Sequence, residues 1–120
     1  MDKIKADLIK WKSRLGLSDW DITVEFKNAQ DMRQNMGIAA IRENIQHAAI
    51  RLMKTEDRQQ SEPGEDDIEL DLVHELIHVR LWAVDQDDTK GVPHACKEQA
   101  IEWIAKVLIK TDRQADQGER

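Results

Sequence analysis

The spacing of apolar residues divides the first half of the chain into a helix and three extended segments. Between residues 4 and 15, apolar side chains recur every three or four positions, which predicts an amphipathic helix that ends at Gly16. Apolar and polar residues alternate over 20–27, with the two-residue period of a half-buried strand. A polar connection is predicted over 28–35.

Two further strands are predicted over residues 37–42 and 45–53, joined at Glu43 and Asn44. Both contain a pair of alanines, which do not favour a sheet, so a helix is the alternative for this region. Residues 54–67 are acidic and polar, include a Pro-Gly pair and lack apolar periodicity, which predicts a mobile loop.

The second half of the chain has the apolar content of two helices. Residues 70–82 predict a buried helix, with the acidic pair at 66–67 in its first turn, where the helix dipole favours negative charge. A loop over 85–91 precedes a last helix that opens at 92–93. Its apolar positions predict one broad buried face, made by Ala100, Ile101, Trp103, Ile104, Val107 and Leu108. From Thr111 onward the chain is polar and is predicted to fray.

Together these elements predict one α+β domain over residues 1–120, with 111–120 as its frayed tail. The domain combines an N-terminal helix, a small and mainly antiparallel sheet of three or more strands, a central helix and a C-terminal helix. No apolar run is long enough for a signal peptide or a membrane span, and a single cysteine excludes an internal disulfide. These features predict a cytoplasmic protein without a membrane role.

A formal net charge of -6 disfavours nucleic acid as a partner, because such a binding face needs clustered lysine and arginine. The basic residues of the first helix are interpreted as its solvated face. They are Lys3, Lys5, Lys10, Lys12 and Arg14. The four tryptophans stand at apolar positions and are interpreted as core residues.

His74, Glu75 and His78 form a His-Glu-x-x-His pattern in the predicted central helix. At about 3.6 residues per turn, both imidazoles lie on one face and can reach one metal ion. Burying these groups without a partner would cost roughly several kcal/mol, which a cation removes. The pattern predicts a Zn2+ site with two histidine ligands, beside which Glu75 takes a proton from a zinc-activated water. A fortuitous match on a buried helix is the alternative.

A catalytic zinc site has three protein ligands, and Glu98 is the predicted third. Glu102 lies four residues further along the same helix and is predicted to accept a hydrogen bond from a ligand ring, with a solvated surface position as the alternative. His94, just before this helix, is the rival to Glu98 as third ligand. Cys96 can bind zinc, but a lone cysteine is more often a small core residue.

With Glu98 downstream and Glu102 one turn further on, the pattern resembles the gluzincin motif of thermolysin-like zinc peptidases. The chain is most similar to the small single-domain zincin-like proteins of bacteria and their phages, over residues 20–109. The metzincin pattern does not fit, because Leu81 and Val84 stand where it requires glycine and histidine. An SprT-like site, with His94 as third ligand, is the runner-up.

The resemblance implies a zincin-like fold and a zinc-dependent metallopeptidase that hydrolyses an extended polypeptide, with Glu75 as general base. Thermolysin-like enzymes also use histidine or tyrosine donors from a second lobe to bind the oxyanion, and this chain contains no tyrosine. The available donors are His47, Arg80 and His94. The alternative function is a metal-stabilised binding or regulatory domain with little or no catalysis.

One of the two alanine-containing strands is a candidate substrate site. If it forms an exposed edge beside the metal, an extended peptide can bind by adding a strand to the sheet. Alanine and glycine on such an edge allow close approach. Ordinary packing of these small residues is the alternative.

Overall fold

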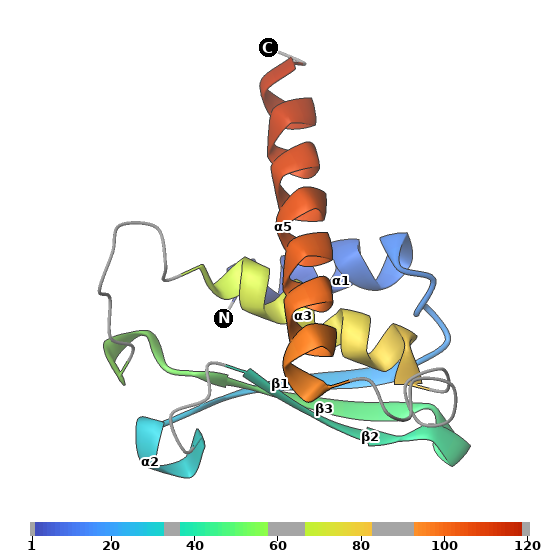
Figure 1. The fold of residues 1–120 in the computed structure, drawn as a ribbon, viewed down its shortest axis with the longest axis vertical. Helices are drawn as coiled ribbons and strands as arrows, with labels where there is room; N and C mark the ends of the chain where they lie inside the picture. The colour runs from blue at the N-terminus through green and yellow to red at the C-terminus, as the bar shows by residue number, and fades with distance from the viewer. Residues whose placement is uncertain (1, 33–36, 58–66, 83–92, 119–120) are drawn as a thin grey trace.

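The described part of the chain forms a three-stranded sheet with its long helices on one side (Figure 1). The computed structural model describes residues 2–32, 37–57, 67–82 and 93–118. The elements in chain order are α1 (Asp2–Arg14), β1 (Asp21–Lys27), α2 (Ala29–Met32), β2 (Gly37–Arg42), η1 (Glu43–Ile45), β3 (His47–Met53), η2 (Thr55–Asp57), α3 (Ile68–Arg80) and α5 (His94–Gly118). Helix α3 packs on the sheet and α1, and α5 packs on α3. The predicted α+β class is confirmed.

The sheet is mixed, with the strand order β1-β3-β2. Strands β2 and β3 form an antiparallel pair in which Gly37 lies opposite Leu52 and Arg42 opposite His47. Strand β1 runs parallel to β3. The chain reverses between β1 and β2 and again between β2 and β3, so β1 becomes parallel once it pairs with β3 instead of β2. The prediction of a mainly antiparallel sheet is therefore wrong for the β1-β3 pair.

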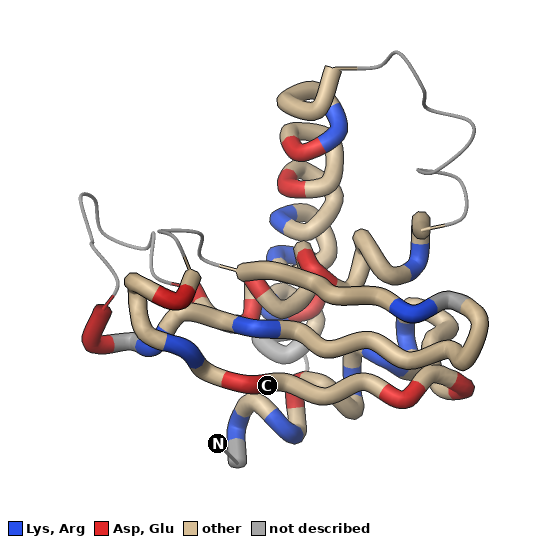
Figure 2. Tube along the Cα trace, turned by 90° about the horizontal axis from the view of Figure 1, so that it is seen from below, with Lys and Arg blue, Asp and Glu red and all other residues tan. Residues whose placement is uncertain are grey.

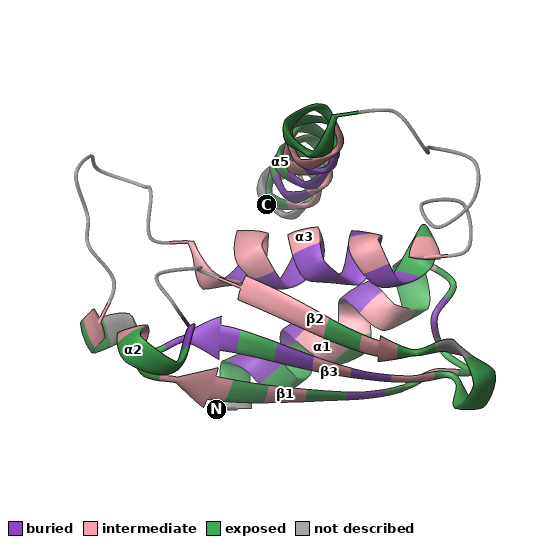
Figure 3. Cartoon of the chain, turned by 60° about the horizontal axis from the view of Figure 1, so that its bottom comes forward, coloured by how far each residue is buried: buried purple, intermediate pink, exposed green. Residues whose placement is uncertain are grey.

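The core lies between the sheet and helices α1 and α3 (Figure 3). Alternate positions of β3 face it, and Ala48, Ile50 and Leu52 have no exposed surface. Helix α3 contributes five buried apolar side chains, which are Leu72, Val73, Leu76, Ile77 and Val79. Each large side chain buried in this way stabilises the fold by about 1.5–3 kcal/mol. This packing fixes where α3 lies on the sheet and which face of the helix the sheet covers.

Local features of the first half follow the sequence with two exceptions. Gly16 has a φ of +71°, the left-handed conformation that ends α1 as predicted. The polar connection contains the short helix α2, because the Asn28 side chain accepts a 2.8 Å hydrogen bond from the backbone N–H of Asp31 and caps its first turn. Ile45 belongs to η1, so β3 begins at His47 and not at Ile45.

Most of the predicted loops lie outside the described residues. This applies to residues 33–35 of the polar connection, to 58–66 of the acidic loop and to the whole loop over 85–91. Residues 55–57 form η2 at the start of the acidic loop. Asp67 is described, and it lies at the cap position just before α3 and not in its first turn.

Helix α5 is apolar on two faces, and only one of them is buried. The buried face packs on α3 and the core through Ile101, Ala105 and Ile109. Three large side chains on the other face are 63%, 47% and 54% exposed, and these are Trp103, Ile104 and Val107. The predicted single broad buried face is therefore wrong, as is a core position for Trp103. Cys96 is also exposed, so its predicted core role is wrong.

Ion pairs with α1 support the C-terminal half of α5. The carboxylate of Asp112 pairs with Lys10, at 2.9 Å, and with Arg14. Helix α5 continues to Gly118, so the prediction that the chain frays from Thr111 is wrong over 111–118. Lys10 and Arg14 are also not simply solvated, because both contact a carboxylate on another helix.

A second set of contacts joins α5 to α3 through the buried carboxylate of Glu69. Glu69 accepts hydrogen bonds from the Trp11 indole at 2.7 Å and from Arg113 at 3.2 Å, and it pairs with Lys10 at 3.0 Å. Arg113 also donates to Asp67 at 3.0 Å. Helices α1, α3 and α5 therefore meet at one carboxylate, which sets how α5 lies along α3.

Acidic and basic positions are interspersed along the strands, as Figure 2 shows from below the sheet. Among the described residues, the strands carry no continuous stripe of Lys and Arg. Within the same residues, none of the helices combines the length and the apolar character that crossing a bilayer requires.

Candidate metal centre

Helix α3 places His74 and His78 on the side that faces α5. Its first turn is capped by Asp67, whose side chain accepts a 3.1 Å hydrogen bond from the backbone N–H of Leu70. Since its apolar residues are buried against the sheet and α1, the two histidines remain on the surface that α5 covers, and both are partly buried. Their ring centroids are 5.1 Å apart, as expected for positions one helical turn apart.

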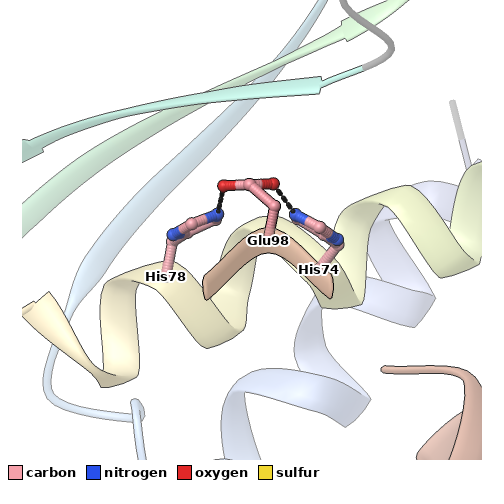
Figure 4. Close-up of side chains that lie close together, drawn as sticks. All are labelled: His74, His78 and Glu98. Atoms are coloured by element: carbon pink, nitrogen blue, oxygen red, sulfur yellow. Dashed lines mark hydrogen bonds and ion pairs between the residues drawn. The ribbon is translucent and has the colours of Figure 1, made fainter. Parts of the chain in front are cut away.

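Helix α5 places Glu98 beside both histidines (Figure 4). Glu98 Oε2 lies 2.8 Å from His74 Nε2, and Glu98 Oε1 lies 2.8 Å from His78 Nε2. The potential ligand atoms of these three residues all lie within 4.8 Å of one another. Two imidazole nitrogens and one carboxylate oxygen form a donor set that suits zinc. The three residues can therefore hold a metal ion.

Glu102 contacts the other nitrogen of the His74 ring. Its Oε1 lies 2.9 Å from His74 Nδ1. A proton on Nδ1 that is donated to Glu102 leaves the Nε2 lone pair available to a metal. Glu102 therefore occupies the position predicted for it from the four-residue spacing to Glu98, and it is not simply a solvated surface carboxylate.

The carboxylates around His74 favour its protonated form. Burial lowers the pKa of His74, but the hydrogen bond to Glu102 and the negative charges of Glu75 and Glu98 outweigh burial, so that its pKa is raised. A metal ion must displace one proton from the charged ring, since a histidine ligand binds as the neutral ring. Cation binding at these residues therefore competes with protons.

Glu75 is the most buried carboxylate of the centre, with 8% of its surface exposed. Burial raises its pKa to about 7, and the charges of Glu98, Asp71 and Glu102 act in the same direction, against that of His74. Glu75 thus lies near the histidines without being one of the three grouped ligand residues. A carboxyl group that titrates near neutral pH can both accept and donate a proton.

An open pocket of about 340 Å³ adjoins these side chains. Its lining combines strand β2 with the candidate metal residues and consists of Gly37, Ile38, Ala39, Ile41, Glu75, His78, Trp82, His94 and Glu98. A second hollow of about 360 Å³ lies beside Asp67 and Arg113 and includes none of the grouped residues. The pocket beside β2 therefore gives access to Glu75, His78 and Glu98.

The other candidate residues are placed differently. The His94 side chain is 86% exposed, and its Nε2 lies 3.9 Å from Glu98 Oε1, so Glu98 and not His94 completes the described group. Of the three proposed oxyanion donors, only His94 lines the pocket. Arg80 instead donates to the backbone oxygen of Gly16 at 3.0 Å, and His47 pairs with the far end of β2 at Arg42.

Sequence reasoning did not find two residues of this site. Trp82 stands at an apolar position that predicts a core residue, but it lines the pocket. Gly37 lies against the Glu75 carboxylate, and nothing in the local pattern around either residue signals that contact.

A comparison of the chain with protein-family models, curated proteins and solved structures found no match. The site must therefore be interpreted from its own geometry.

Replacing Glu102 by glutamine is expected to weaken zinc binding by about 10–100-fold, the usual effect of removing a partner of a histidine ligand. Glutamine keeps the shape of the side chain but removes the charge that holds the Nδ1 proton of His74. Competition with a chromophoric chelator measures the affinity. Glu56→Gln, at an exposed carboxylate on η2, is the control and should bind as the parent does. Equal affinities for Glu102→Gln and the parent would show that this hydrogen bond has no role in binding.

Proposed function

We propose that the protein is a zinc-dependent peptidase of the gluzincin type. The observation that carries the proposal is the convergence of His74, His78 and Glu98 from two helices, beside a buried Glu75 and an open pocket. Bound zinc supplies Lewis acidity toward a carbonyl oxygen and lowers the pKa of water at the site. Two histidines and a glutamate leave a fourth position for this chemistry.

Glu75 is the proposed proton carrier of the reaction. It accepts a proton from the water that attacks the scissile carbonyl and then delivers that proton to the departing amine. Its pKa of about 7 in the protein chain alone suits both steps near neutral pH. His94, which lines the same pocket, is the available nitrogen donor for the oxyanion.

Strand β2 is the proposed substrate site. Among the described strands it lies at the edge of the sheet, because it pairs with β3 on one side and β1 lies beyond β3. It also lines the pocket that contains Glu75 and His78. An extended polypeptide can pair with the outer edge of β2 through its backbone, which brings a peptide bond beside the histidines. The substrate we propose is therefore an unfolded or extended segment of polypeptide.

A metal-stabilised binding domain is the second candidate. The observation that favours it is the scarcity of oxyanion donors, since the chain has no tyrosine and the pocket includes one exposed histidine. In that case zinc adds to folding stability, and a peptide binds at β2 without being cleaved.

The test combines metal content with cleavage of an unstructured fluorogenic peptide library. The protein is purified without added zinc, as the parent, Glu98→Ala and His94→Ala. The parent and His94→Ala are expected to contain one zinc per chain, and Glu98→Ala to lose it. Cleavage by the parent should stop with a chelator and return with zinc. A parent that binds no zinc, or that cleaves equally well in chelator, would rule out the peptidase. Zinc binding without cleavage would favour the binding domain.

A further inference from the structure

Gly37, the first residue of β2, lies directly beside the Glu75 carboxylate. A Cβ atom built at position 37 would be 2.9 Å from Glu75 Oε2, 3.1 Å from Cγ and 3.3 Å from Cδ. Real Cβ atoms essentially never approach another atom within 3.0 Å. A side chain at position 37 would therefore have to displace the end of Glu75.

The requirement for glycine here concerns space and not backbone conformation. Among the described glycines, only Gly16 has a positive φ. Position 37 thus has a backbone that any residue can adopt, and it pairs with Leu52 in a regular antiparallel register. Alanine in a strand interior is normally more favourable than glycine by roughly 0.5–1 kcal/mol. The three heavy atoms nearest to the built Cβ all belong to Glu75, so this side chain opposes the substitution.

Glu75 can yield only by rotating its own side chain toward the pocket that it lines. It is 8% exposed, and its neighbours Leu76 and Ile77 are buried in the core, so the helix cannot shift without disturbing the packing. Displacement would have to occur at the side-chain torsions of Glu75. The carboxylate would then leave the position it holds beside His78 in the pocket.

We propose that Gly37 is a positioning residue, which keeps open the space in which the Glu75 carboxylate lies against the edge strand. The consequence for catalysis rests on the proposed peptidase function, whereas the contact itself does not. Because Gly37 has no Cβ, the proton-transferring carboxylate of Glu75 can lie directly against the strand that would hold the substrate. Displacing a reacting group by about 1 Å costs on the order of 100-fold in rate.

The experiment is a double-mutant cycle between positions 37 and 75, read as melting temperature without metal. Gly37→Ala is expected to lower the melting temperature by about 4 °C or more in the parent. In the Glu75→Ala background, the same change should be neutral or raise it, because the opposing side chain is gone. Glu75→Asp, which lacks the Oε2 atom but keeps a carbon at the Cγ position, should remove only part of the penalty.

Kinetics and metal content separate positioning from a general structural role. Gly37→Ala should bind zinc as the parent does, and its loss of activity should fall mainly on kcat, by about 100-fold. An equal loss of melting temperature in the parent and Glu75→Ala backgrounds would overturn the proposal, because the change would then act on the sheet. Parent-like melting temperature and kcat in Gly37→Ala would also overturn it. If the parent cleaves nothing, the peptidase proposal fails, and the melting cycle still decides whether Gly37 positions Glu75.

Discussion

Glu75→Gln should lower kcat/KM for peptide cleavage by about 10²–10⁴-fold and leave one zinc bound per chain. Glutamine has nearly the same shape and can still fill the space beside Gly37, but it cannot accept a proton. The three residues grouped as candidate ligands are unchanged by the substitution. The loss should therefore fall on kcat, because the proton is transferred in the transition state and not in substrate binding.

Initial rates with the fluorogenic peptides, together with elemental analysis of the same samples, measure both effects. Glu56→Gln provides the matched control, since it makes the same chemical change at an exposed carboxylate on η2. A Glu75→Gln protein that cleaves at the parent rate would exclude Glu75 as the proton carrier. Loss of zinc in Glu75→Gln would instead mean that Glu75 contributes to holding the metal.

Without metal, the protein is expected to lose roughly 2 kcal/mol of stability as the pH rises from about 5 to about 7. The pKa of Glu75 is about 7 in the folded chain, against an ordinary value of 4.5 for this carboxyl group. Over this range the folded state keeps a proton that the unfolded state has released, so a higher pH favours unfolding. His74, whose pKa is also raised, acts in the same direction above its unperturbed value of 6.5.

Urea unfolding of the metal-free protein at a series of pH values measures this loss. The carboxylates with lowered pKa, Glu69 and Asp112, contribute stability above their ordinary values of 4.5 and 3.8, so their titration lies below the window in which Glu75 and His74 act. Glu75→Gln should be more stable than the parent at about pH 7 and should depend much less on pH. If the stability of the parent stays constant or rises across this window, the pKa of Glu75 is not raised by burial.

The elements that depend on local pattern were predictable from the sequence. The two-residue alternation of β1 and the periodicity of α1 appear in the structure where they were expected. The four-residue spacings within His74/His78 and Glu98/Glu102 also predicted which side chains share a helix face. Once α3 and α5 pack on each other, these faces meet, and the geometry around His74 follows.

Features that depend on tertiary contacts were not predictable in this way. Local alternation does not specify which strand pairs with which, so the parallel β1-β3 pairing was missed. Apolar periodicity in α5 predicts one broad face and cannot tell which of its positions meet the core, so the exposure of Trp103 was not predictable. The contact between Gly37 and Glu75 joins a strand to a helix distant in the sequence, and neither residue carries a local sign of it.

The candidate metal centre is divided between two helices that are made at different times. Helix α3 carries both histidines, whereas Glu98 and Glu102 come only with α5, the last described helix of the chain. A nascent or truncated polypeptide that ends before α5 has a two-nitrogen site at best, which binds zinc weakly. Any hydrolytic activity of the proposed peptidase would thus require this last described helix to have docked on α3.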